Sequence, residues 1–181
     1  STVSNSAFSS VKSNETVISY KVGMDSTYAN SMMPGDIVNV YLKAKSDDGT
    51  IMFGKFIGNI KILDMKDSNG QRVFENTTEA RTPAYMLFAL PEDMHLLFRK
   101  AIYLSNSYDV ELILVPNTEK VEKDADVYVS SKDIQDFIND KTKMVSVDEI
   151  LSSTEDKVNT TENNDNKTDD TVDKSTNNKN Q

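Results

Sequence analysis

The sequence has no cysteine and no tryptophan, and His95 is its only histidine among 181 residues. Without cysteine there are no disulfides, no thiolate metal ligands and no cysteine nucleophile. One histidine without cysteine also argues against a zinc site. A serine triad would have to use His95, and no G-x-S-x-G motif presents the nucleophile. We therefore expect His95 to be an exposed or half-exposed helical residue rather than a catalytic one.

Basic charge is also in short supply. The chain has 20 Lys and Arg against 29 Asp and Glu, which gives a net charge of −9 and a pI of about 4.6. Such a chain is repelled by phosphate backbones and by anionic lipid surfaces, so we expect no nucleic-acid partner. No apolar run reaches the length of a membrane span, and no secretory signal is present. Because the chain begins at Ser1 rather than at a methionine, we expect it to be either a processed product or a trimmed piece of a longer protein.

Apolar residues are unevenly distributed. Residues 16–115 are rich in Val, Ile, Leu, Met, Phe and Tyr, whereas Val158 and Val172 are the only aliphatic residues from Ser152 onwards. A segment that buries so little cannot offset its ordering entropy. The expected organisation is a linker at 1–13, a β-rich domain at 14–117, a short helical appendage at 118–151 and a disordered acidic tail at 152–181.

Strand patterns dominate the domain. The β-branched run Thr16–Val22 predicts a strand, and Ile37–Leu42 predicts another, with Val38, Val40 and Leu42 on its core face. The second strand follows Met33-Pro34-Gly35-Asp36, in which proline and glycine suit a type II turn. Beyond a hairpin turn at 47–49, the apolar stretches 51–57 and 60–65 are either two strands or one strand bent at Gly58.

A strand–helix–strand unit at 83–115 is the most clearly patterned part. Pro83–Leu90 predicts a central strand, and Pro91 fits the first position of a helix. The apolar residues from Met94 to Ile102 fall on one face of a helix at 91–104, and Tyr108–Val115 predicts the closing strand. In the appendage, Ser131 is expected to cap a short helix. The predicted fold class is α+β and β-dominated: a small mixed sheet, or a β-clip or barrel-like domain, with one main helix.

Carboxylates are plentiful, so a paired-acid hydrolase remains open on composition. The candidates all fall at predicted turns or helix starts, where capping and solvation explain them. The turn Asp67-Ser68-Asn69-Gly70 lacks the rest of a calcium-loop pattern, and no phosphate-binding loop occurs. We assign no catalytic, cofactor-binding or metal-binding residue, and no cofactor. The carboxylates considered are Asp47, Asp48, Asp67, Glu92, Asp93, Asp124 and Asp126.

Five segments between residues 18 and 117 follow one another in a fixed order: ISYKVGMD, PGDIVNVYL, IGNIKILDM, YMLFALPEDMHLLFRKAIYLSN and YDVELILVPN. In this order they resemble the CpaB/RcpC family of Flp (Tad) pilus assembly proteins. The position after Asp36, which is basic in the family, is Ile37 here. The family motif, a turn and the strand after it, corresponds to Pro34, Gly35, Asp36, Val38 and Val40.

The resemblance implies a structural, non-enzymatic role in the cell envelope. Family members look like extracytoplasmic components of the Flp/Tad secretion machine, at the outer face of the cytoplasmic membrane or in the periplasm. The implied partners are other pilus assembly proteins, with peptidoglycan as a further candidate, and the implied full-length protein has an upstream membrane anchor. The family's anchor and its SAF (β-clip) domain are not visible in this chain. A cell-wall-binding or adhesive module and a carboxylate-pair wall hydrolase remain as alternatives.

Overall fold

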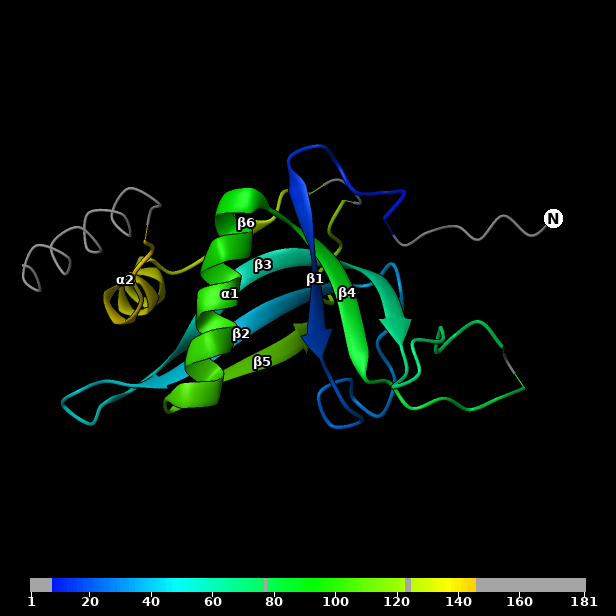
Figure 1. Cartoon of the computed structure of the whole chain (residues 1–181), viewed down its shortest axis with the longest axis horizontal. Helices are drawn as coiled ribbons and strands as arrows, with labels where there is room; N and C mark the ends of the chain where they lie inside the picture. Colours follow the sequence, from blue (N-terminus) through cyan, green and yellow to red (C-terminus); the bar gives the residue numbers. More distant parts are fainter. Residues whose placement is uncertain (1–7, 77, 123–124, 146–181) are drawn as a thin grey trace, which may run out of the picture. The chain divides into compact units, whose positions relative to one another are not determined.

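The structure is a computed structural model that describes residues 8–76, 78–122 and 125–145. The predicted β-dominated α+β class is confirmed (Figure 1). One compact unit ends at Thr142, and it contains every helix and strand of the described residues. The elements are β1 (Glu15–Lys21), β2 (Ile37–Lys45), β3 (Ile51–Lys66), β4 (Tyr85–Pro91), α1 (Glu92–Ser107), β5 (Val110–Pro116), β6 (Tyr128–Val129) and α2 (Lys132–Lys141).

The sheet has the strand order β1-β4-β3-β2-β5, and β6 pairs with β3 outside this path. Each of these pairings is antiparallel. The two apolar stretches at 51–57 and 60–65 belong to a single long strand, β3. Its first part pairs with β2 and its last part with β4, and the bend between them contains Asn59 at a φ of 62°. Of the two sequence-based alternatives, the bent strand is therefore correct.

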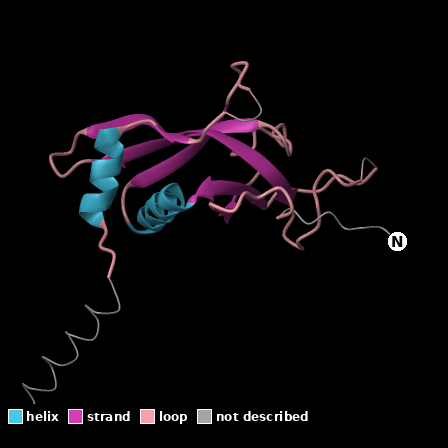
Figure 2. Cartoon of the chain, turned by 90° about the horizontal axis from the view of Figure 1, so that it is seen from above, coloured by secondary structure: helices cyan, strands magenta, loops and turns pink. Residues whose placement is uncertain are grey.

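The bend divides the sheet into two layers that cross each other. Figure 1 shows β1, β4 and α1 side by side in front of β2, β3 and β5, and Figure 2 shows the same layers from above. The core lies between them, with the Phe98 ring of α1 at its centre, 5.3 Å from the Phe88 ring and 6.3 Å from the Phe56 ring. The predicted core face of β2, formed by Val38, Val40 and Leu42, is fully buried.

Helix α1 differs from its prediction at both ends. Pro91 is not the first helical residue but the N-cap, with φ −51° and ψ 147°. Its backbone stays extended because β4 continues through Pro91, which pairs with Glu15 of β1. At the other end the helix continues to Ser107, since Leu104 extends the apolar stripe and is buried.

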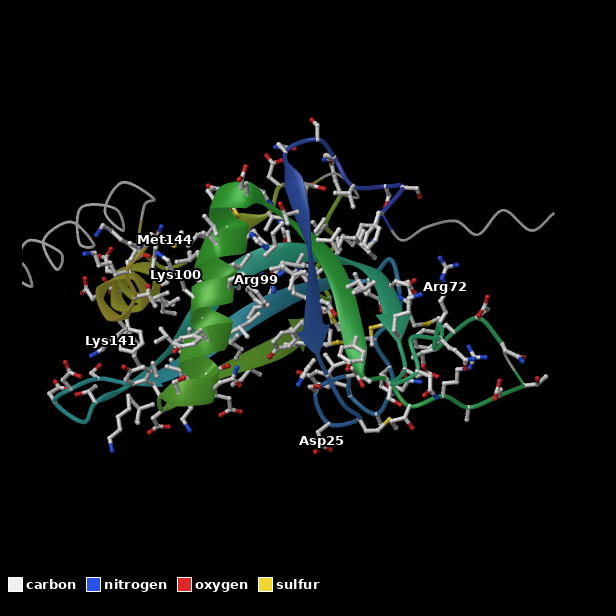
Figure 3. The ribbon with its side chains drawn as sticks, in the orientation of Figure 1. Asp25, Arg72, Arg99, Lys100, Lys141 and Met144 are labelled. Carbon is white, nitrogen blue, oxygen red and sulfur yellow. The ribbon has the colours of Figure 1, made fainter. Side chains whose placement is uncertain are left out.

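Helix α2 packs into the same core. The predicted cap is confirmed, because the Ser131 side chain accepts a hydrogen bond of 3.3 Å from the Ile134 amide. Ile134 and Ile138 are buried, and α2 contacts both α1 and β3. Lys100, labelled in Figure 3, belongs to α1. It donates a hydrogen bond of 3.1 Å to the Asn139 side chain of α2.

Several expectations fall outside the described residues. The predicted tail at 152–181 and Asp124 lie there, as does the first half of the predicted linker. Within the described ranges, neither helix has the length and apolarity needed to cross a membrane.

Candidate functional site

The motif Pro34-Gly35-Asp36 forms the predicted turn. The Asp36 amide donates to the Met33 carbonyl oxygen (3.0 Å), and Gly35 has a φ of 94°, a conformation that favours glycine. The Asp36 carboxylate accepts a hydrogen bond of 2.8 Å from the Met33 amide. The turn is fixed to the bend of β3 by two backbone hydrogen bonds with Ile62, donated by Gly35 (2.8 Å) and accepted by Asp36 (2.9 Å). The motif therefore holds the two layers together at the bend, and Val38 and Val40 lie in the core.

A cavity of about 390 Å³ lies between this turn, the segment before it and the end of β5. The segment before it contains a left-handed turn, in which Tyr28, Ala29 and Asn30 have φ values of 54°, 55° and 63°. This left-handed turn is costly for residues other than glycine. It is held by the Tyr28 hydroxyl, which donates to the Leu114 carbonyl oxygen of β5 at 3.0 Å.

The side of the β3–β2–β5 layer that faces away from the core carries apolar side chains, and we call it the outer face. Phe53 is 60% exposed and Ile51 is 51% exposed, although both are paired with β2, Phe53 with Lys43 and Ile51 with Lys45 beside the hairpin turn. The rings of Tyr41 and Phe53 lie 6.1 Å apart on neighbouring strands. By strand register, the outer face comprises Ile51, Phe53 and Lys55 of β3, Tyr41, Lys43 and Lys45 of β2, and Glu111, Ile113 and Val115 of β5.

Tyr128 of β6 covers the end of the outer face nearest the bend. Lys55 donates a hydrogen bond of 3.3 Å to the Tyr128 hydroxyl, and its ammonium group lies 5.9 Å from the ring centroid. This hydrogen bond is the main cause that raises the pKa of Lys55. The ring fits only because residue 58 is glycine: a Cβ atom there would lie 2.4 Å from the ring. Lysine and aromatic side chains are thus combined at one surface.

In β5, alternate residues hydrogen-bond to β2, and the residues between them turn their backbone groups to the free edge of the sheet. Asn117 donates to the Ile37 carbonyl oxygen (2.9 Å) and Lys45 donates to that of Asp109 (3.2 Å), so the odd-numbered residues of β5 pair with β2. The amide and carbonyl groups of the even-numbered residues therefore point to the free edge. Leu114 accepts from Tyr28 there, and Pro116 has no N–H to offer.

His95 is half-buried on α1, as expected from the sequence. Its Nε2 atom accepts a hydrogen bond of 3.1 Å from the Arg99 guanidinium. Burial, followed by the charge of Arg99, lowers the pKa of His95. The side chain that hydrogen-bonds to it is thus a cation rather than a carboxylate that would orient a catalytic base.

Five of the carboxylates singled out in the sequence serve local structure. Glu92 and Asp93 lie in the first turn of α1. Asp67 accepts hydrogen bonds from the amides of Asn69 (2.9 Å) and Gln71 (2.8 Å) within its own turn. Asp48 accepts a hydrogen bond of 2.9 Å from the Thr50 amide, which is the main cause that lowers its pKa. Asp47 pairs with Lys141 at 2.9 Å, between the β2–β3 hairpin and α2. Among the described residues, no group of three or more His, Asp or Glu side chains is placed to hold a metal ion.

One buried carboxylate was not singled out. Asp64 is 6% exposed and follows the register shift in β3. It accepts from the Arg72 guanidinium at 3.0 Å, and Lys66 lies 3.6 Å away. These partners connect β3 to the 67–84 segment, so Asp64 has a structural explanation.

Comparison with protein-family models, with curated proteins and with solved structures gave no match to this chain.

The outer face was not identified from the sequence as a site. Its signal is present in Ile51-Met52-Phe53-Gly54-Lys55, where Ile51, Phe53 and Lys55 fall on one side of the strand and Met52 and Gly54 on the other. Alternation identifies the two sides of a strand but does not tell which of them lacks a covering layer. The exposure of Phe53 is therefore a finding of the structure.

Proposed function

We propose that this chain is a non-catalytic assembly module that binds a protein partner through the outer face. The observation that carries the proposal is the exposure of Phe53 and Ile51 beside the half-buried Tyr41. Aromatic residues are enriched in the buried centres of protein interfaces, and exposed apolar clusters mark docking surfaces. The sheet beneath these residues pairs on both sides of β2, so we expect the surface to be formed before a partner arrives.

We propose the cell envelope, and a Flp/Tad pilus apparatus in particular, as the setting. The support is the order of the five segments that resemble the CpaB/RcpC family. In the fold they become β1, the motif turn with β2, the bend of β3, β4 with α1, and β5. The partners in this setting are other pilus assembly proteins, outside the cytoplasm.

The test is surface pilin in a strain that lacks the gene. We expect pilin to be made and processed but not displayed, and we expect wild-type complementation to restore it. A Phe53→Ala, Tyr41→Ala double variant should be stably produced but should fail to complement. The matched control is Tyr103→Ala, since Tyr103 is 67% exposed on α1 and away from the outer face. Unchanged surface pili in the deletion strain would remove the pilus setting.

Cell-wall binding is a second candidate, favoured by the combination of aromatic rings with Lys43 and Lys55 on the outer face. Sugar rings stack on exposed aromatic side chains, and lysine side chains attract the carboxylates of wall polymers. Cosedimentation with purified cell wall, without any other pilus component, tests this candidate. Loss of cosedimentation in the Phe53→Ala, Tyr41→Ala variant would support it, and absence of the wild-type protein from the pellet would exclude it.

A further inference from the structure

The two edges of the sheet are not equally open. The free edge of β1 faces α1, which contacts β1 and lies beside it in the same layer (Figure 1). The free edge of β5 belongs to the other layer, and α1 crosses that layer on its core side. At the C-terminal end of β5, the Tyr28 hydroxyl donates to the outward carbonyl oxygen of Leu114, and Pro116 has no outward N–H group. As far as the described residues go, the open part of the edge is therefore centred on Leu112.

Leu112, like Leu114, is an even-numbered residue of β5 and does not hydrogen-bond to β2. Its amide and its carbonyl group therefore both point to the open part of the edge. Pairing of these two groups with another extended chain is the recognition mode in which a peptide adds a strand to a sheet. Natural proteins normally protect such edges with charges, proline or covering loops. Here the protection by Tyr28 and Pro116 stops before the middle of the strand.

Side chains beside the opening define the chemistry of a matching strand. Glu111 precedes Leu112 in β5, and its exposed side chain belongs to the outer face. Lys43 lies opposite it on β2. Ile113 follows on the same face. A strand added at the free edge would place one side chain next to Glu111 and another next to Ile113, since neighbouring strands align their side chains on each face.

We propose that the β5 edge binds an extended segment of a partner protein, with an apolar residue beside Ile113 and a lysine or arginine beside Glu111. This inference rests on the proposed function, because it specifies how the assembly partner is held. The added strand extends the β3–β2–β5 layer. The outer face then continues onto the partner.

A second copy of this chain is a poor match for the same edge. Two-fold symmetric pairing of β5 with itself about the open part of the edge has three registers, centred on Glu111, Leu112 or Ile113. A register centred on Glu111 brings two carboxylates together, and one centred on Leu112 places Glu111 opposite Ile113. A register centred on Ile113 requires the Leu114 carbonyl, which Tyr28 occupies, and Pro116, which has no N–H. No register gives Glu111 a cation, so a different protein is the better occupant.

The test uses two short synthetic peptides of alternating valine and threonine, one with a central lysine and one with glutamate in its place. In NMR titrations of the ¹⁵N-labelled protein, the lysine peptide should shift the Leu112 amide and slow its exchange. It should bind about fivefold more tightly than the glutamate peptide, as expected for an opposite-charge cross-strand pair. Glu111→Lys should reverse this preference, and a lysine peptide with N-methylated backbone should not bind.

Leu112→Pro is the matched protein variant, because the Leu112 amide does not belong to the ladder with β2, so its loss removes an edge donor and no ladder hydrogen bond. It also shortens a half-buried side chain that packs against the core, so we expect some loss of stability. It should keep the fold and lose peptide binding. The inference would be overturned if the peptide shifted NMR signals away from β5 instead. It would also be overturned if Glu111→Lys left the lysine peptide as the tighter binder. Both outcomes can be read even if Leu112→Pro does not fold. Peptide binding without a pilin defect would remove only the pilus setting. A pilin defect without peptide binding would overturn the proposed peptide site at the β5 edge and leave the proposed function standing.

Discussion

Gly58 shows how one missing Cβ atom determines the arrangement of its neighbours. We expect Gly58→Ala to lower the free energy of unfolding by about 1–2 kcal/mol, because the Cβ would overlap the Tyr128 ring and force it to move. The cost should be near the low end, since the ring is 37% exposed and can swing outward. Chemical denaturation measures the change.

Two variants control for this result. In a Tyr128→Ala background the extra cost of Gly58→Ala should disappear, because nothing remains for the Cβ to displace. Gly23→Ala should be neutral or stabilising by up to about 1 kcal/mol, since no atom lies within 4 Å of its added Cβ. An equal cost of Gly58→Ala with and without Tyr128 would show that the ring contact is not its cause.

His95 makes a pH-dependent contribution at the same scale. Its pKa in the folded protein lies below the ordinary 6.5, so the unfolded chain binds the proton more readily. Protonation therefore favours unfolding, and stability is lost as the pH falls through about 6.5 towards the folded pKa. Relative to His95→Gln, the wild type should lose stability between about pH 7.5 and pH 5.5. Parallel stability curves over this range would contradict the prediction.

At the scale of elements, β5 should show alternating protection of its amides. The Ile113 amide pairs with β2, whereas the Leu112 amide points to the free edge. Exchange with solvent should therefore be faster at Leu112 than at Ile113 in the free protein, measured by NMR at neutral pH. Similar slow exchange at both positions would mean that another group already covers the edge, and the proposed peptide site would lose its basis.

The elements also show where sequence reasoning succeeds and where it stops. The core face of β2 was predictable, because alternation around Val38 and Val40 is a local pattern that burial reinforces. The extension of β4 through Pro91 was not, since pairing with Glu15, far away in the sequence, decides it. The left-handed turn at Tyr28 is likewise fixed by a hydrogen bond to Leu114, 86 residues further along. Long-range contacts thus decided what local propensity left open.

At the scale of the whole molecule, α2 is part of the core rather than an addition to it. The sequence predicted a short helical appendage with a small apolar stripe, which is all that a local pattern can indicate. In the structure, Ile134 lies 3.3 Å from the position that a Cβ on Gly54 would occupy, and Ile138 is fully buried. The glycine in β3 is what allows α2 to approach so closely. The helix therefore completes a core that α1 and the sheet leave open.

We therefore expect the protein to unfold in one cooperative step up to Thr142. Ile138→Ala should destabilise α2 and the sheet together, by about 2–5 kcal/mol, because it leaves a cavity in the shared core. Asp136→Ala on the exposed side of α2 is the control and should change stability by less than about 1 kcal/mol, since its pair with Lys132 is a surface ion pair. Native-state hydrogen exchange gives the readout: α2 and β3 amides should report the same unfolding free energy in wild type and shift by the same amount in Ile138→Ala. If α2 amides exchange at far lower free energy than those of β3, the helix opens independently, and the description of one cooperative core is wrong.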